Sequence, residues 1–346
     1  MKTNNTNKER AIAMDKQTVT IYDVACEADV SMATVSRVVN GNPNVKPATR
    51  KKVLDVIERL DYRPNAVARG LASKKTTTVG VIIPDVTNIY FSALARGIDD
   101  IAMMYKYNII LTNSDENGRK EVQVLNTLMA KQVDGIVFMG NAVSEELRKE
   151  FDRAKTPIVL AGCVDEKGQM PSVNIDYTAA VEEAVKNLID RGNQKVAFIS
   201  GNLADPINRD FRLKGYKQAL KKAGIRYDDK LVFETDYTYK AGQLLQPALQ
   251  SVGATAAVVG DDELAAGVMN GVTDAGLNVP NDFELITSND TKLTEMVRPK
   301  MSSITQPLYD IGAVAMRLLT KLMNNEEVEE KTVLLPYGLM KRDTTN

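Results

Sequence analysis

The sequence contains no histidine and only two cysteines, Cys26 and Cys163, among its 346 residues. Without histidine, the chain lacks the side chain that most often acts as an acid or base near neutral pH, and the commonest transition-metal ligand. Two cysteines give neither a disulfide framework nor the spacing of a metal site. We therefore predict no catalytic residues, no metal and no cofactor, although an enzyme built on carboxylates and lysines remains a disfavoured alternative.

Long apolar runs are also absent. No segment approaches the roughly 18 consecutive apolar residues that a membrane span requires, and residues 1–5 lack the apolar core of a signal peptide. We therefore expect a cytoplasmic protein with no membrane partner. Residues 1–17 are polar and unpatterned, which predicts a disordered tail. Met14 stands just before the first patterned segment and is a candidate start of the natural chain.

The charge is unevenly distributed along a chain that is long enough for two or three domains. Residues 1–75 carry 14 lysines and arginines against 8 aspartates and glutamates, a net charge of +6, and the remainder carries −7. A basic segment on an acidic body suits a DNA-reading domain attached to a body that does not itself bind DNA.

Residues 20–41 predict two short helices joined by a tight turn. Thr20 followed by Asp23 is a capping pattern for the first helix, and Ser31 caps the second. The second helix leaves small polar side chains and one arginine facing outward, as in a helix-turn-helix whose second helix enters a major groove. The pattern alone also fits a helical hairpin packed on another element. A third helix is predicted over 47–60.

From residue 76 onward, short β-branched runs alternate with helical stretches. This alternation predicts an α/β core of two doubly wound lobes, each with a parallel sheet covered on both faces, and a ligand cleft between the lobes. The predicted strands are 78–84, 108–112, 134–139 and 157–161 in one lobe, and 195–201, 231–234, 256–260 and 283–286 in the other. The chain is expected to recross near 302–307 and to continue as a long helix from about 309 to 323.

Residues 30–40, Val-Ser-Met-Ala-Thr-Val-Ser-Arg-Val-Val-Asn, closely resemble the headpiece of LacI/GalR-family transcription regulators. The resemblance extends over about forty residues, as far as Asn65. It implies a homodimer with a type I periplasmic-binding-protein-like core. The implied domains are a helix-turn-helix domain at 18–63, a hinge helix at 64–75 and the core at 76–346. Lobe 1 is expected at about 76–175 and 306–335, and lobe 2 at about 176–305 and 336–346.

The same resemblance implies which residues touch DNA. Arg37 is expected to contact guanine, because its guanidinium matches the O6 and N7 atoms, and Met32 and Ala33 are expected to set operator preference. In the family the hinge helix forms only on DNA, where the leucine matching Leu71 enters the minor groove; a plain linker is the alternative. Cys26 stands where close relatives carry arginine. The expected DNA-binding residues are Thr20, Tyr22, Ser31, Met32, Ala33, Thr34, Ser36, Arg37, Asn40, Asn44, Tyr62, Asn65, Ala68 and Leu71.

The cleft is expected to be lined by loops at the carboxyl ends of strands. Its expected residues are Asp85, Asn88, Tyr90, Arg212, Asp261 and Asn289, facing a polyhydroxylated or phosphorylated ligand such as a sugar phosphate. Residues 288–291 read Ser-Asn-Asp-Thr where relatives read Phe-Asp-Asn-Thr. Because the sugar-gripping aspartate becomes Asn289, we do not expect a tight free-sugar site. Asp262 is expected to complement the dipole of its helix.

Residues 306–321 and 104–108 resemble, almost word for word, the catabolite-control members of this family. Arg317 and Lys321 lie one helical turn apart, and such a pair suits a phosphate group. In those members the partner is the serine-phosphorylated form of HPr, a phosphocarrier of sugar transport. The resemblance implies that Tyr105, Tyr309, Asp310, Arg317 and Lys321 bind this corepressor.

The sequence therefore predicts a transcription regulator of carbon catabolite repression and activation in a Gram-positive bacterium. It would bind pseudo-palindromic double-stranded operators as a homodimer, with serine-phosphorylated HPr as corepressor. The alternative is a sugar-inducible repressor of the same family without HPr control. A sugar-binding transport protein with an unrelated head is disfavoured by the basic headpiece, and an enzyme by the lack of a glycine-rich phosphate loop or a nucleophile–base pair.

Overall fold

The computed structural model describes residues 19–63, 75–115, 120–140 and 142–346. The chain forms two compact units, Met1–Thr76 and Thr77–Asn346. The described part of the first unit contains the helices α2 (Ile21–Glu27), α3 (Met32–Val39) and α4 (Pro47–Arg59). They enclose a small apolar core formed by Val24, Ala25, Ala28, Val35, Val38, Val53 and Val56. The three predicted helices are thereby confirmed.

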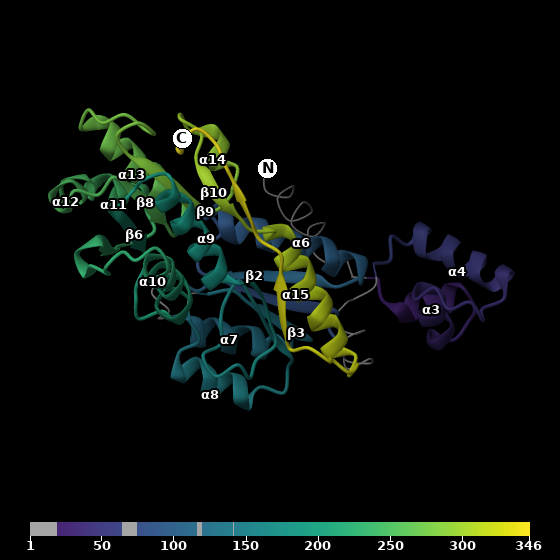
Figure 1. Ribbon diagram of the computed structural model, residues 1–346. Coiled ribbons are helices and arrows are strands. Elements are labelled where there is room, and N and C mark those ends of the chain that lie inside the picture. The colour runs from purple at the N-terminus through teal and green to yellow at the C-terminus, as the bar shows by residue number, and fades with distance from the viewer. Residues whose placement is uncertain (1–18, 64–74, 116–119, 141) are drawn as a thin grey trace, which may run out of the picture. The chain divides into compact units, whose positions relative to one another are not determined.

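The second unit contains two six-stranded sheets (Figure 1). The first sheet has the strand order β11-β5-β4-β3-β1-β2 and is parallel. Its strands are β1 (Thr78–Ile83), β2 (Asn108–Asn113), β3 (Gly135–Phe138), β4 (Ile158–Ala161), β5 (Ser172–Ile175) and β11 (Thr332–Leu335). Helices α6 (Ile89–Met104) and α15 (Leu308–Met323) cover one face, and α7 (Glu121–Ala130) and α8 (Glu145–Arg153) cover the other.

The second sheet has the strand order β12-β10-β9-β8-β6-β7. Its strands are β6 (Val196–Ser200), β7 (Val232–Glu234), β8 (Ala256–Val259), β9 (Glu284–Asn289), β10 (Ser302–Thr305) and β12 (Gly338–Met340). Helices α9 (Tyr177–Asp190) and α10 (Leu213–Lys222) pack on one face. The other face carries α11 (Tyr239–Leu244), α12 (Gln246–Val252) and α13 (Asp262–Asp274). Short turns of helix lie at Ile207–Arg212, Asp229–Leu231 and, as α14, at Leu293–Met296.

The chain passes between the two sheets three times: after β5, after β10 and after β11. The strand that follows the third crossing is the one departure from the predicted parallel pattern, since β12 pairs antiparallel with β10. Only two residues separate β11 from β12, so the chain passes directly from the edge of the first sheet to the edge of the second.

Helices α6 and α15 cross with their backbones in contact. A Cβ atom at Gly97 would lie 2.0 Å from the carbonyl oxygen of Tyr309, and one at Gly312 would lie 2.0 Å from that of Leu94. Only glycine fits at these two positions. The crossing therefore fixes where the first turn of α15 lies on α6.

Candidate functional site

The helix pair of the first unit is built on caps that the sequence predicts. The Thr20 N–H donates to Asp23 Oδ2 over 2.8 Å, and the Asp23 N–H donates back to Thr20 Oγ1 over 3.4 Å. The Thr20 N–H, followed by the Thr20 hydroxyl, donates to the Asp23 carboxylate and lowers its pKa. The Thr34 N–H donates to Ser31 Oγ over 3.2 Å and starts α3. Gly41, at φ +70°, reverses the chain after α3.

Helix α3 presents one polar and one apolar face. Val35 and Val38 are buried, whereas Met32 is 51% exposed and Ala33 and Arg37 are also exposed. Thr34 and Ser36 are half-buried. This leaves the outward side of α3 with the short side chains and single arginine that reading of base edges requires. The other predicted contacts lie around it: Tyr22, Asn40 and Asn44 are exposed, and Tyr62 is half-buried against the core of this unit. Asn65, Ala68 and Leu71 lie outside the described residues.

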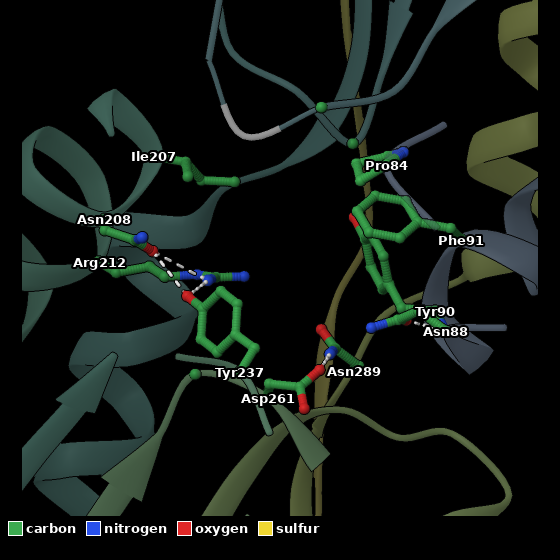
Figure 2. Close-up of a pocket in the computed structure, with 13 residues that line it drawn as sticks. Pro84, Asn88, Tyr90, Phe91, Ile207, Asn208, Arg212, Tyr237, Asp261 and Asn289 are labelled. Carbon is green, nitrogen blue, oxygen red and sulfur yellow. Dashed lines mark hydrogen bonds between the residues drawn. The ribbon is translucent and has the colours of Figure 1, made fainter. Parts of the chain in front are cut away.

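The predicted cleft is present as a cavity of about 60 Å³ in the second unit. Figure 2 shows Asn208, Arg212 and Tyr237 on one side of it and Pro84, Tyr90 and Phe91 on the other. The lining residues are Pro84, Asn88, Tyr90, Phe91, Gly140, Gly162, Ile207, Asn208, Arg212, Tyr237, Gly260, Asp261 and Asn289. Five of the six predicted residues are among them, and Asp85 is not.

Asp85 is used locally instead. Its carboxylate accepts hydrogen bonds from the Thr87 N–H over 2.8 Å and from the Thr87 hydroxyl over 2.7 Å. These bonds close an Asp-x-Thr turn and lower the pKa of Asp85. Asp85 therefore does not line this cavity, contrary to expectation, and its carboxylate is hydrogen-bonded within the turn.

Arg212 is the buried cation of the cleft, with 7% of its surface exposed. Its Nη1 donates to Tyr237 Oη over 2.9 Å and to Asn208 Oδ1 over 3.1 Å, and its guanidinium lies 5.4 Å from the ring centre of Tyr177. Among the described residues, no carboxylate is within ion-pair distance of it. The cleft therefore holds a buried positive charge whose partners are neutral. Asn208 and Tyr237 were missed from the sequence.

The two aspartates that begin α13 differ in role. Asp261 caps the helix, since its Oδ1 accepts the N–H groups of Glu263 and Leu264. Asp262 lies in the first turn as expected but is buried, and it accepts the Thr287 hydroxyl and the Thr291 N–H, each over 2.8 Å. Burial, followed by the neighbouring Asp261, raises the pKa of Asp262 to about 7. Asp262 therefore joins α13 to β9 and the residues that follow it.

The predicted corepressor residues lie on two packed helices, α6 and α15, and we term their exposed side the α6–α15 surface: Tyr105, Tyr309, Asp310, Arg317 and Lys321. Tyr105 ends α6 and is 43% exposed; Tyr309 is 45% exposed, and its hydroxyl donates to Asp100 over 3.2 Å. Asp310, Arg317 and Lys321 are spaced by seven and four residues, so they form one exposed row along α15. Within the described ranges, neither Arg317 nor Lys321 takes part in an ion pair.

No helix in the described part of the chain is long and apolar enough to cross a bilayer. The same part of the chain contains no group of three or more cysteine, aspartate or glutamate side chains that could hold a metal ion.

Each of the two units matches the model of a known protein family. Residues 20–65 match the model of bacterial regulatory proteins of the lacI family, and residues 185–345 match a periplasmic binding protein-like domain. The chain is 62% identical to catabolite control protein A of Streptococcus mutans, over 95% of this chain and 98% of that one. It is 58% identical to the protein of the same name from Priestia megaterium, over 94% and 99% of the two chains.

Solved structures agree with this relationship. The regulator CcpA of Lactococcus lactis has a TM-score of 0.75 and 48% identity, covering 78% of this chain and 99% of that one. The lac repressor dimer bound to operator and an anti-inducer has a TM-score of 0.84 and 26% identity, covering 95% and 99%. The chain thus belongs to the catabolite control protein A group of the lacI family, which are DNA-binding transcription regulators in carbon catabolite control and not enzymes.

Proposed function

We propose that this regulator binds pseudo-palindromic operators as a homodimer and takes serine-phosphorylated HPr as its corepressor. The observation that carries the proposal is the exposed row of Arg317 and Lys321, which have no ion-pair partner among the described residues. A phosphoserine adds close to two negative charges and strong acceptor oxygens, which match such a pair. Tyr105 at the end of α6 and Tyr309 in the first turn of α15 supply large exposed rings on which a docked protein can pack.

DNA recognition is assigned to the outward side of α3. Arg37 is the candidate for a bidentate contact with guanine, and Met32 and Ala33 lie beside it near the start of the helix. A twofold operator matches a twofold protein, and the lac repressor bound to operator, a dimer, supports the same assembly here. We assign the hinge, 64–75, to the minor groove, with Leu71 as the wedge.

The corepressor signal reaches DNA through linkage. HPr increases operator affinity only if it binds more tightly to the lobe arrangement that suits DNA than to the other arrangement. The backbones of α6 and α15 touch where Gly97 meets Tyr309, so we expect the two helices to move together. A partner held on the α6–α15 surface therefore biases the whole first lobe.

The cleft is the proposed site of a sugar phosphate. Arg212 supplies a buried positive charge without a carboxylate partner among the described residues, which an anionic group would neutralise. The cavity of about 60 Å³ is smaller than the roughly 300 to 1,000 Å³ of most ligand pockets. Binding of a sugar-sized ligand therefore requires the lobes to separate.

Isothermal titration of the full-length protein with phosphorylated and unmodified HPr, without DNA, tests the proposal. We expect binding of the phosphoprotein only. Binding of simple sugars, with no response to either form of HPr, would support the sugar-inducible alternative. Titration with a hexose phosphate and with the parent hexose separately tests the cleft, where we expect heat from the phosphate alone.

A further inference from the structure

A basic groove lies on the second lobe, along α10 and the helical turn before it, and it shares no lining residue with the cleft or with the α6–α15 surface. We term it the lysine groove: about 450 Å³ of open space lined by Arg209, Asp210, Lys214, Lys217, Gln218 and Lys221. Lys214, Lys217 and Lys221 are spaced by three and four residues, so they form one exposed row along α10.

The lysines of this row form no ion pair in the described structure, unlike the cations beside them. The one acidic residue that lines the groove, Asp210, has its pKa lowered mainly by its hydrogen bond from Arg209, with a smaller contribution from Lys214. The Arg209 guanidinium is bound by Asp210 and Glu166, and Lys222 is bound by Glu182. Lys217 lies over the ring of Tyr227, with its Nζ 4.7 Å from the ring centre. Across the described ranges, none of the three lysines of the row lies within ion-pair distance of a carboxylate. Three positive charges therefore face solvent on a body whose net charge, from residue 76 onward, is −7.

The complementary charge lies elsewhere on the same chain. The segment between α15 and β11, which we term the glutamate loop, carries Glu326, Glu327, Glu329 and Glu330, all exposed. In the described structure none of them forms an ion pair. Figure 1 shows α10 and the C-terminal end of α15 well apart in the second unit, so the loop does not reach the groove of its own chain.

We propose that the lysine groove of one copy receives the glutamate loop of a second copy. Because the two surfaces differ, the contact is heterologous and joins copies beyond a twofold pair. Exposed charge pairs are individually weak and are screened by salt. The contact is therefore weak in free solution, and it becomes effective where copies are held close together, as on neighbouring operators of one DNA molecule.

Sedimentation velocity of the full-length protein at about 0.05 M and about 0.5 M NaCl tests this proposal. The groove variant is K214E/K217E/K221E, the loop variant is E327K/E329K/E330K, and a swapped variant carries all six changes. The triple variant K131E/K149E/K155E is the control for the groove variant, since it changes the net charge by the same amount at exposed lysines of the other lobe.

We expect the wild type and the control variant to form larger species at low salt that dissociate at high salt. The groove and loop variants should stay small at both salt concentrations, and the swapped variant should associate again. An unchanged size of the wild type at both concentrations would overturn the proposal, as would a swapped variant that stays small. Binding of a polyglutamate peptide to the groove without self-association would also overturn it, in favour of a foreign acidic protein.

Discussion

Gln306 donates its side-chain N–H to Oδ1 of Asn289 over 2.8 Å, and Asn289 Nδ2 donates in turn to Asp261 Oδ2 over 3.3 Å. All three side chains are buried. Asp261 and Asn289 line the cleft, and Gln306 lies on the crossing between β10 and α15. Asn289 is the position where the resemblance to the LacI/GalR family led us to expect a sugar-binding aspartate. In this chain its amide connects the cleft to the segment that begins the helix of the α6–α15 surface.

This bridge predicts the effect of restoring the carboxylate. Asn289→Asp places a second buried carboxylate beside Asp261, so one of the two must take up a proton or remain as an unfavourable like-charge pair. A group with a raised folded-state pKa loses its stabilising effect as pH rises. We expect the free energy of unfolding of the variant to be lower than that of wild type by about 1 to 3 kcal/mol at pH 8. Near pH 4 the difference should be smaller. Urea unfolding at both pH values measures this, and exposed Asn281→Asp should show no such trend.

Glu121 provides a second test of pH dependence. It is 6% exposed at the start of α7, and burial, followed by the charge of Asp205, raises its pKa to about 7 from the ordinary 4.5. Because the folded state holds this proton more tightly than the unfolded state, stability is lost as pH rises through this interval. Glu121→Gln removes that loss, so the variant should gain on wild type between pH 4.5 and pH 8, by at most about 3 kcal/mol. The control Glu146→Gln, at an exposed position, should show no such gain. If the stability of wild type and of Glu121→Gln changed with pH in the same way, the raised pKa of Glu121 would be contradicted.

The capping box predicts local stability in the DNA-binding unit. Thr20→Ala removes the side-chain acceptor for the Asp23 N–H, which should cost about 1 kcal/mol of local unfolding free energy. Hydrogen exchange of the full-length protein should show faster exchange over α2 and unchanged exchange in the sheets of the second unit. Thr20→Ser keeps the acceptor and should behave as wild type. Equal exchange in the two variants would mean that the cap contributes little.

Arg37 is predicted to specify sequence rather than to add general affinity. Arg37→Lys keeps the charge but loses the planar fork that matches guanine. Operator binding should weaken by about 1 to 3 kcal/mol, while binding to random DNA at the same salt concentration stays near wild type. Arg59→Lys, a matched change on α4, should affect neither. A uniform loss on both DNAs would assign Arg37 to phosphate contact.

The features that could be predicted are those set by residues close together in the sequence. The caps at Thr20 and Ser31 and the apolar strands are determined by residue patterns that extend over only three or four positions. Asn208 and Tyr237 could not be found in this way, because they meet Arg212 only through tertiary packing. Strands β5, β11 and β12 are short and carry polar or exposed residues, so their pairing is set by the sheets they join.

The loop after β1 contains both a correct and an incorrect prediction of cleft residues. Asn88 and Tyr90 line the cavity, as the position of the loop after β1 predicts. Asp85 does not line it, because its carboxylate forms a local turn with Thr87 two residues later. The prediction took into account only that Asp85 follows the end of a strand. Asp262 likewise appears as an ordinary first-turn carboxylate until Thr287 and Thr291 are brought against it by β9.

The most direct test is operator binding with and without serine-phosphorylated HPr, at one fixed salt concentration, for wild type and Arg317→Ala. The operator is pseudo-palindromic with a central CG step, and Arg226→Ala is the control for loss of an exposed arginine. The account predicts that the phosphoprotein, and not unmodified HPr, increases the affinity of the wild type and the control. Arg317→Ala should keep its basal affinity and lose this increase. Tight operator binding by the wild type that does not respond to phosphorylated HPr would contradict the account.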